Sequence, residues 1–120
     1  MKLTNGIVFG SREALQKLMA ERLPVKTSYW LAKMARKLND QLEVIEAVRI
    51  GLIKQYGTQD EGEQNVSVKA GSENYARFVA DFNELMSQEV ELDIEKVKLP
   101  EDGLTIAPEV LFALDPFIEL

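Results

Sequence analysis

The longest regular pattern in the chain is a row of apolar residues between Thr27 and Tyr56. Its members recur at spacings of three and four, interrupted once by Gln41: Leu31, Met34, Leu38, Ile45, Val48 and Leu52. This spacing, in a stretch without proline, predicts one long helix that Gly57 ends in the left-handed conformation. About 30 residues span about 45 Å as a helix, whereas a compact domain of this size is about 35 Å across. We therefore expect the helix to project beyond the body or to lie against a second subunit.

The two halves of this long helix differ in their patterns. The first half has a narrow apolar stripe and a basic face with Lys33, Arg36 and Lys37. Residues 42–53 carry apolar side chains on several sides, which is typical of a helix that is buried on several sides. The pattern therefore predicts that residues 42–53 form the centre of the core.

The segment before the long helix predicts a strand and then a shorter helix. Asn5-Gly6 stands between short apolar runs, so residues 2–8 are expected to form a hairpin or a single interrupted edge strand. Ser11 is a good N-cap for a helix that continues to Leu23, and Pro24 would end that helix.

The remaining elements alternate between helical and extended patterns. Ser72 can cap a helix that runs to Gln88, because its apolar residues follow helical spacing: Tyr75, Phe78, Val79, Phe82, Leu85 and Met86. Residues 90–94 and 66–68 alternate as strands do, and Pro108 is well placed to start a short helix to Leu114. The prediction is a single domain, 1–120, of the mostly helical α+β class. It has a long central helix, two further amphipathic helices and a small antiparallel sheet of short strands near residues 2–8, 66–68 and 90–94.

Composition excludes several kinds of chemistry. The chain has no cysteine and no histidine, so disulfides, zinc sites and Ser–His or Cys–His nucleophiles are excluded. No glycine-rich phosphate loop is present. No apolar run is long enough to span a membrane, and the first residues do not have the pattern of a signal peptide. We expect a cytoplasmic protein that is not an enzyme and has no cofactor or metal.

The net charge of −6 is unevenly distributed along the chain. Residues 1–56 hold ten basic and five acidic side chains, and residues 57–120 hold four basic and fifteen acidic ones. One interpretation is that the acidic half folds over the basic helices and neutralises them. The other is an exposed acidic face that meets a basic partner or imitates nucleic acid.

Three groups of residues are candidate binding sites. The row with Leu31, Met34, Leu38 and Gln41 fits either packing within the chain or self-association, in which a buried Gln41 would set the register. A second group consists of carboxylates at every other position: Glu91, Asp93 and Glu95. They could hold magnesium, but the preferred interpretation is the exposed face of a strand. The basic row beside Tyr29 and Trp30 could bind single-stranded nucleic acid. We do not expect this partner, because Trp30 is predicted to pack under the corner at Pro24 and the chain is acidic.

Three stretches carry a resemblance to a known group of proteins: LPVKTSYWLAKMARKL, ELMSQEVELDIEKVKL and APEVLFALDPFIEL. In this order and spacing the chain resembles a family of short uncharacterised proteins encoded by tailed bacteriophages and prophages. In that family a Ser or Thr often precedes the proline of the closing helix, where this chain has Ala107, so we expect no side-chain cap there. The resemblance implies action inside an infected bacterium and supplies no catalytic residue.

These observations lead to one main functional hypothesis and one alternative. The main hypothesis is a non-enzymatic phage or prophage accessory protein that binds protein, including copies of itself as a homo-oligomer, with virion or tail assembly as one role. The alternative is an acidic inhibitor that occupies a basic groove on a host nucleic-acid enzyme or defence complex. A carboxylate-based, metal-dependent enzyme is a more distant third.

Overall fold

The computed structural model describes residues 1–58, 67–100 and 103–120. Within these residues the chain forms four helices and four short strands. The helices are α1 (Asn5–Met19), α2 (Val25–Tyr56), α3 (Glu73–Ser87) and α4 (Pro108–Leu114). The strands are β1 (Lys2–Thr4), β2 (Glu89–Glu91), β3 (Val97–Lys98) and β4 (Ile118–Glu119). The predicted mostly helical α+β class is confirmed.

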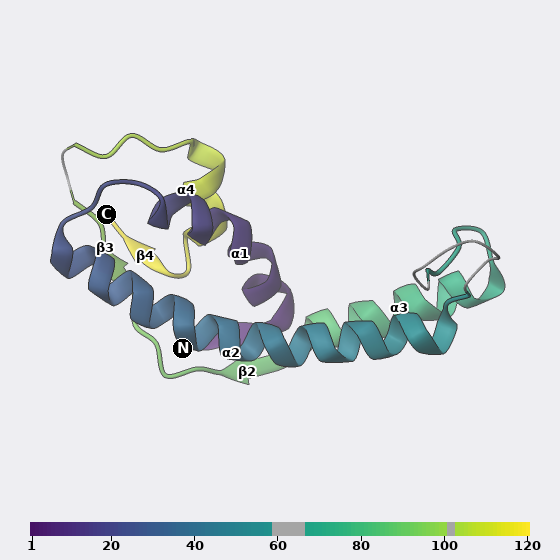
Figure 1. The fold of residues 1–120 in the computed structure, drawn as a ribbon. Coiled ribbons are helices and arrows are strands. Elements are labelled where there is room, and N and C mark those ends of the chain that lie inside the picture. Colours follow the sequence, from purple (N-terminus) through teal and green to yellow (C-terminus); the bar gives the residue numbers. More distant parts are fainter. Residues whose placement is uncertain (59–66, 101–102) are drawn as a thin grey trace.

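The long helix α2 organises the molecule. It runs unbroken for 32 residues, and the other elements gather along it in two groups. α1 and β3 lie against its N-terminal half, with α4 packed on α1 and β4 paired with β3, whereas α3 runs beside its C-terminal half (Figure 1). The extents are 53 × 31 × 22 Å and the radius of gyration is 17.5 Å, compared with about 14 Å for a compact domain of this length. The helix therefore projects beyond the body, as its length predicts.

The start of α1 differs from the prediction. Thr4 caps this helix by accepting a hydrogen bond from Ile7 N at 3.2 Å, so residues 5–9 are helical and the strand ends at Thr4. Ser11 is not a cap but a buried residue inside α1, and its hydroxyl donates to Val8 O. Gly6 serves close packing here instead of a turn, because a Cβ on it would lie 3.3 Å from Met86 O.

The ends of the other helices agree better with the sequence. The hydroxyl of Ser72 accepts from Tyr75 N and caps α3 as predicted, and α4 has the predicted bounds. α1 ends at Met19, earlier than Leu23. Gly57 ends α2 with φ −85° and ψ 164°, so the predicted left-handed closure is wrong.

The strands form two separate pairs. β1 and β2 are antiparallel, with Leu3 opposite Val90, which confirms the expected small antiparallel sheet. β3 and β4 are parallel, a pair that the sequence analysis did not predict. Of the strand expected at 66–68, residue 66 lies outside the described residues, and Ser67 forms an isolated bridge with Thr58 and does not join the sheet.

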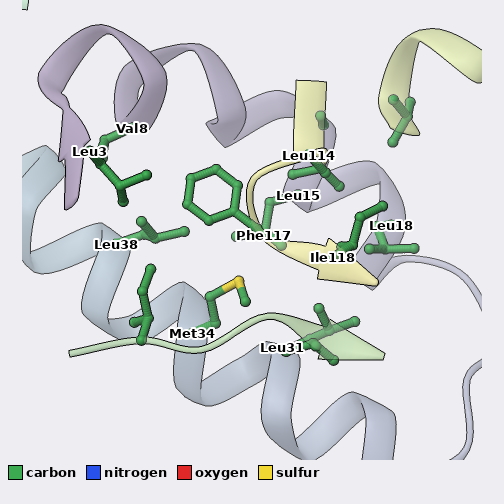
Figure 2. Packing of buried hydrophobic residues seen from close by; sticks show 14 of the residues in the cluster. Leu3, Val8, Leu15, Leu18, Leu31, Met34, Leu38, Leu114, Phe117 and Ile118 are labelled. Carbon is green, nitrogen blue, oxygen red and sulfur yellow. The ribbon is translucent and has the colours of Figure 1, made fainter. Parts of the chain in front are cut away.

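Most of the core lies beside the N-terminal half of α2, and of α3 the C-terminal residues Leu85 and Met86 pack against it. Leu31, Met34 and Leu38 point from α2 toward Phe117, which is fully buried between α2 and the residues of α1 and α4 (Figure 2). Residues 42–53 were expected at its centre, but of these only Ile45 is buried, while Val44 is 56% exposed and Val48 43%. The prediction of a core centred there is wrong, because this part of α2 has α3 beside it but neither α4 nor the C-terminal segment.

Candidate functional site

The predicted partner-binding row on α2 is part of the core. Leu31, Met34 and Leu38 are at most 3% exposed and pack within the chain (Figure 2). This burial supports intramolecular packing for the first half of the row, so these three side chains are not a surface for a partner in this fold.

Gln41 contributes to a polar contact within the same chain. Its side-chain amide donates to Asn5 Oδ1 at 2.9 Å, and the amide of Asn5 donates to Leu85 O at 3.0 Å. Asn5 is buried, so these bonds hold α1 in register with α2 and α3. Gln41 therefore sets the register of helices within one chain. A register between subunits, which the sequence analysis considered, is not needed to explain a polar residue at this position.

The three candidate carboxylates have different surroundings. Glu91 lies 3.0 Å from the amino group of Met1, Asp93 lies 3.8 Å from Lys37 Nζ, and Glu95 is exposed beside a groove. Glu89, two residues before Glu91, has its carboxylate 3.1 Å from Lys2 Nζ. In the described parts of the chain no three acidic side chains come close enough to hold a metal ion. Three basic groups of the N-terminal half thus lie beside Glu89, Glu91 and Asp93, which agrees with the neutralising interpretation for this stretch of the chain.

A groove of about 760 Å³ lies between the N-terminal half of α2 and residues 93–100. We call it the basic groove, because five lysines and two acidic residues line it: Lys26, Lys33, Lys37, Lys96, Lys98, Asp93 and Glu95. Buried Met34, Val97 and Leu99 provide an apolar floor. The side chains around this apolar floor thus carry a net charge of +3, whereas the whole chain has a net charge of −6.

Trp30 forms part of the wall of the basic groove. It is 48% exposed, so it is not packed under the corner at Pro24 as predicted, although both residues line the groove. The rings of Trp30 and Tyr29 meet edge to face at 5.4 Å, and Lys33 Nζ lies 5.2 Å from the centre of the Trp30 ring. These contacts orient the indole while leaving about half of it in solvent.

Part of this groove was recognisable in the sequence. Lys26, Lys33 and Lys37 follow helical spacing beside Trp30, and the sequence analysis identified two of these lysines. Lys96 and Lys98 flank Val97 at period two, which places both on the outer face of a strand whose inner residue is buried. What the sequence did not indicate is that these two groups lie on opposite walls of one groove.

A second candidate surface is the arm, which we define as residues 42–56 of α2 together with α3. No residue of α3 is buried, although its apolar stripe has the spacing of a core helix. Phe82 stacks on Phe78 at 5.9 Å and meets Phe9 edge to face at 6.3 Å, yet both Phe78 and Phe82 remain partly exposed. The arm is therefore a two-helix layer whose apolar side chains are only half covered.

One polar contact ties the far end of the arm together. Tyr56 at the end of α2 donates its hydroxyl to an Asp81 carboxylate oxygen of α3 at 2.6 Å. The bond to this carboxylate raises the pKa of Tyr56 above its ordinary value, because the neutral phenol is the donor. Within α2, the hydrogen bond from Arg49 lowers the pKa of Glu46.

Comparison with protein-family models, with curated proteins and with solved structures finds no match to this chain. In the residues that the structure describes, no helix has both the length and the apolar character needed to cross a membrane.

Proposed function

We propose that this chain is a non-enzymatic protein-binding protein that forms a homodimer through the arm. The observation that carries the proposal is α3, an amphipathic helix with six apolar residues at core spacing and no buried residue. With the resemblance noted above, the proposed setting is the cytoplasm of a bacterial host, as a phage or prophage accessory protein that takes part in virion or tail assembly.

A dimer is expected because the two helices of the arm cannot by themselves cover all of their apolar side chains. Stable helical domains pack two layers around a shared core, and the arm supplies one layer. A second copy would supply the other layer and complete a four-helix bundle with two-fold symmetry. Each apolar side chain covered in this way contributes about 25 cal/mol per Å² of buried surface.

Exposed valines of α2 support the same interpretation. Val44 and Val48 are one helical turn apart, and both are more than two-fifths exposed, as is Ile50. Scattered exposed apolar residues are common on protein surfaces. A row of them along a helix whose neighbour α3 is also half covered is better explained by a partner.

Size-exclusion chromatography with light scattering tests this proposal. We expect the wild-type chain to be a dimer at high micromolar concentration, and Val44→Glu with Val48→Glu to be a monomer of unchanged helix content. The matched control is Val25→Glu, an 86% exposed valine at the opposite end of α2, which should remain dimeric. A wild-type monomer at this concentration, or dimeric Val44→Glu/Val48→Glu, would overturn the proposal.

The alternative, an acidic inhibitor of a host enzyme, has weaker support. Two of its three candidate acidic residues, Glu91 and Asp93, lie beside positive groups of the same chain, and so does neighbouring Glu89. These contacts are exposed and weak, but they reduce the local negative potential that such an inhibitor needs.

A further inference from the structure

We propose that the basic groove binds an extended acidic peptide segment of a partner protein, one in which acidic and apolar side chains alternate. This site is at the other end of α2 from the arm and does not depend on dimerisation. The inference rests on the charge of the groove, on its apolar floor and on the edge of β3 that has no neighbouring strand in the described residues.

The charge of the groove favours a negatively charged ligand. Lys26 and Lys33 come from one wall and Lys96 and Lys98 from the other, so a ligand lying between them would meet ammonium groups on both sides. In the described parts of the chain, Lys37 is the only groove lysine with an ion pair, to Asp93. Lys33 lies over the rings of Tyr29 and Trp30, so Lys26, Lys96 and Lys98 are the groove lysines best placed to bind carboxylates.

The floor and wall of the groove favour apolar side chains between the acidic ones. Met34 and Leu99 lie at the bottom and half-exposed Trp30 lies at the side. Tryptophan and apolar pockets of this kind supply much of the affinity in protein recognition, while surrounding charges supply specificity. A purely charged ligand would leave this apolar surface uncovered.

The strand β3 favours an extended conformation of the ligand. Val97 N and Leu99 N donate to Phe117 O and Glu119 O at 2.9 and 2.8 Å, so these groups pair with the β4 side. In the part of the chain that the structure describes, β3 has no strand on its other edge. An extended peptide can pair with such an edge through its backbone while its alternate side chains point to opposite sides.

Single-stranded nucleic acid fits the groove less well. Trp30 is the only aromatic residue among its lining residues, and Lys33 already lies over that ring. Proteins that bind single strands use several aromatic platforms along a continuous positive track.

Trp30 is the only tryptophan in the chain, so its fluorescence reports directly on the groove. The probe is a short synthetic peptide in which glutamate alternates with leucine and phenylalanine. We expect saturable binding that shifts Trp30 emission and weakens as salt increases. The comparison ligands are the same peptide with lysine in place of glutamate, and an oligothymidylate.

Charge-reversal variants provide the second readout, followed by the anisotropy of the labelled peptide. Lys96→Glu with Lys98→Glu should weaken binding about tenfold or more, because both residues line the groove. The matched control is Lys17→Glu with Lys54→Glu, which makes the same charge change outside the groove and should bind as the wild type does. The arm variant Val44→Glu/Val48→Glu should also bind normally, so this inference and the proposed dimer can fail separately.

Three results would overturn the inference. They are equal binding of the glutamate and lysine peptides, unchanged affinity in folded Lys96→Glu/Lys98→Glu, and tighter binding of the oligothymidylate than of the acidic peptide. The last result would identify the groove as a nucleic-acid site instead.

Discussion

Asn5 makes three hydrogen bonds that join the start of α1 to other parts of the chain. Its backbone N–H donates to Gln88 O, its side-chain amide donates to Leu85 O, and its Oδ1 accepts from Gln41. The side chain is 6% exposed, so water does not readily replace these partners. A residue that the sequence pattern assigned to a hairpin or an edge strand thus connects three helices.

Replacing Asn5 by alanine should reduce the free energy of unfolding by about 1–3 kcal/mol, since Leu85 O and the Gln41 amide lose a partner. Urea denaturation measures this change. Asn39→Ala is the control, because Asn39 is an exposed asparagine in α2 and its removal should have little effect. Equal stability of the two variants would show that the Asn5 bonds contribute nothing net.

The hydroxyl of Tyr56 predicts a response to alkaline pH. Because its pKa is raised in the folded chain, its contribution to stability is fully present below the unfolded value of about 10 and is lost as pH rises through the folded pKa. We expect Asp81→Asn to lower the pKa of Tyr56 in a titration of tyrosinate absorbance. Tyr56→Phe should remove the absorbance change that belongs to Tyr56 and so identify it. Tyr75→Phe, the control, should leave that change in place. An unchanged Tyr56 step in Asp81→Asn would contradict the role of this carboxylate.

At the scale of elements, the sequence predicted the helices that are specified by a local pattern of residues. α2, α3 and α4 follow from apolar periodicity, from the cap at Ser72 and from Pro108 at the first helical turn. α1 was misplaced because Asn5-Gly6 resembles a hairpin turn, whereas Thr4 caps a helix there. The pairing of β3 with β4 depends on how the C-terminal segment folds back over α2, which no local pattern encodes.

The start of α4 offers a stabilising substitution. Ala107 has the extended backbone of an N-cap but no side chain that accepts a hydrogen bond. Ala107→Asp should stabilise the chain by about 1 kcal/mol, because the carboxylate can accept from the first free N–H groups of the helix. Thermal unfolding measures the gain. Ala113→Ser, an exposed change inside the same helix, should give none; a loss of stability in Ala107→Asp would show that the cap geometry is wrong.

At the scale of the whole molecule, packing is concentrated at one end of a long helix. The apolar residues 42–53 predicted a core centre because the sequence does not reveal which neighbours a helix has. The same applies to the basic groove, since its two walls are separated by residues 38–92, almost half of the chain. Charge and apolar content were readable from the sequence, but their arrangement in space required the fold.

This arrangement predicts that the arm opens more easily than the core. Amides of α3 should exchange with solvent faster than those of residues 31–38, because α3 has no buried residue. Hydrogen exchange measured by mass spectrometry would show this. If the arms pair, dilution should speed exchange in α3 and leave residues 31–38 unchanged; Val44→Glu/Val48→Glu should show no such dependence. Protection of α3 equal to that of the core in this variant would contradict the prediction.

The groove and the arm are at opposite ends of α2, with Trp30 and Tyr56 about 39 Å apart along the helix axis. Two chains joined at their arms would therefore form a bivalent molecule with its two grooves held far apart. Targets that display acidic segments in a regular array would then be bound with avidity, which can exceed the affinity of one groove by about 10²–10⁴. Such a dimer would respond to the spacing of its targets as well as to their chemistry.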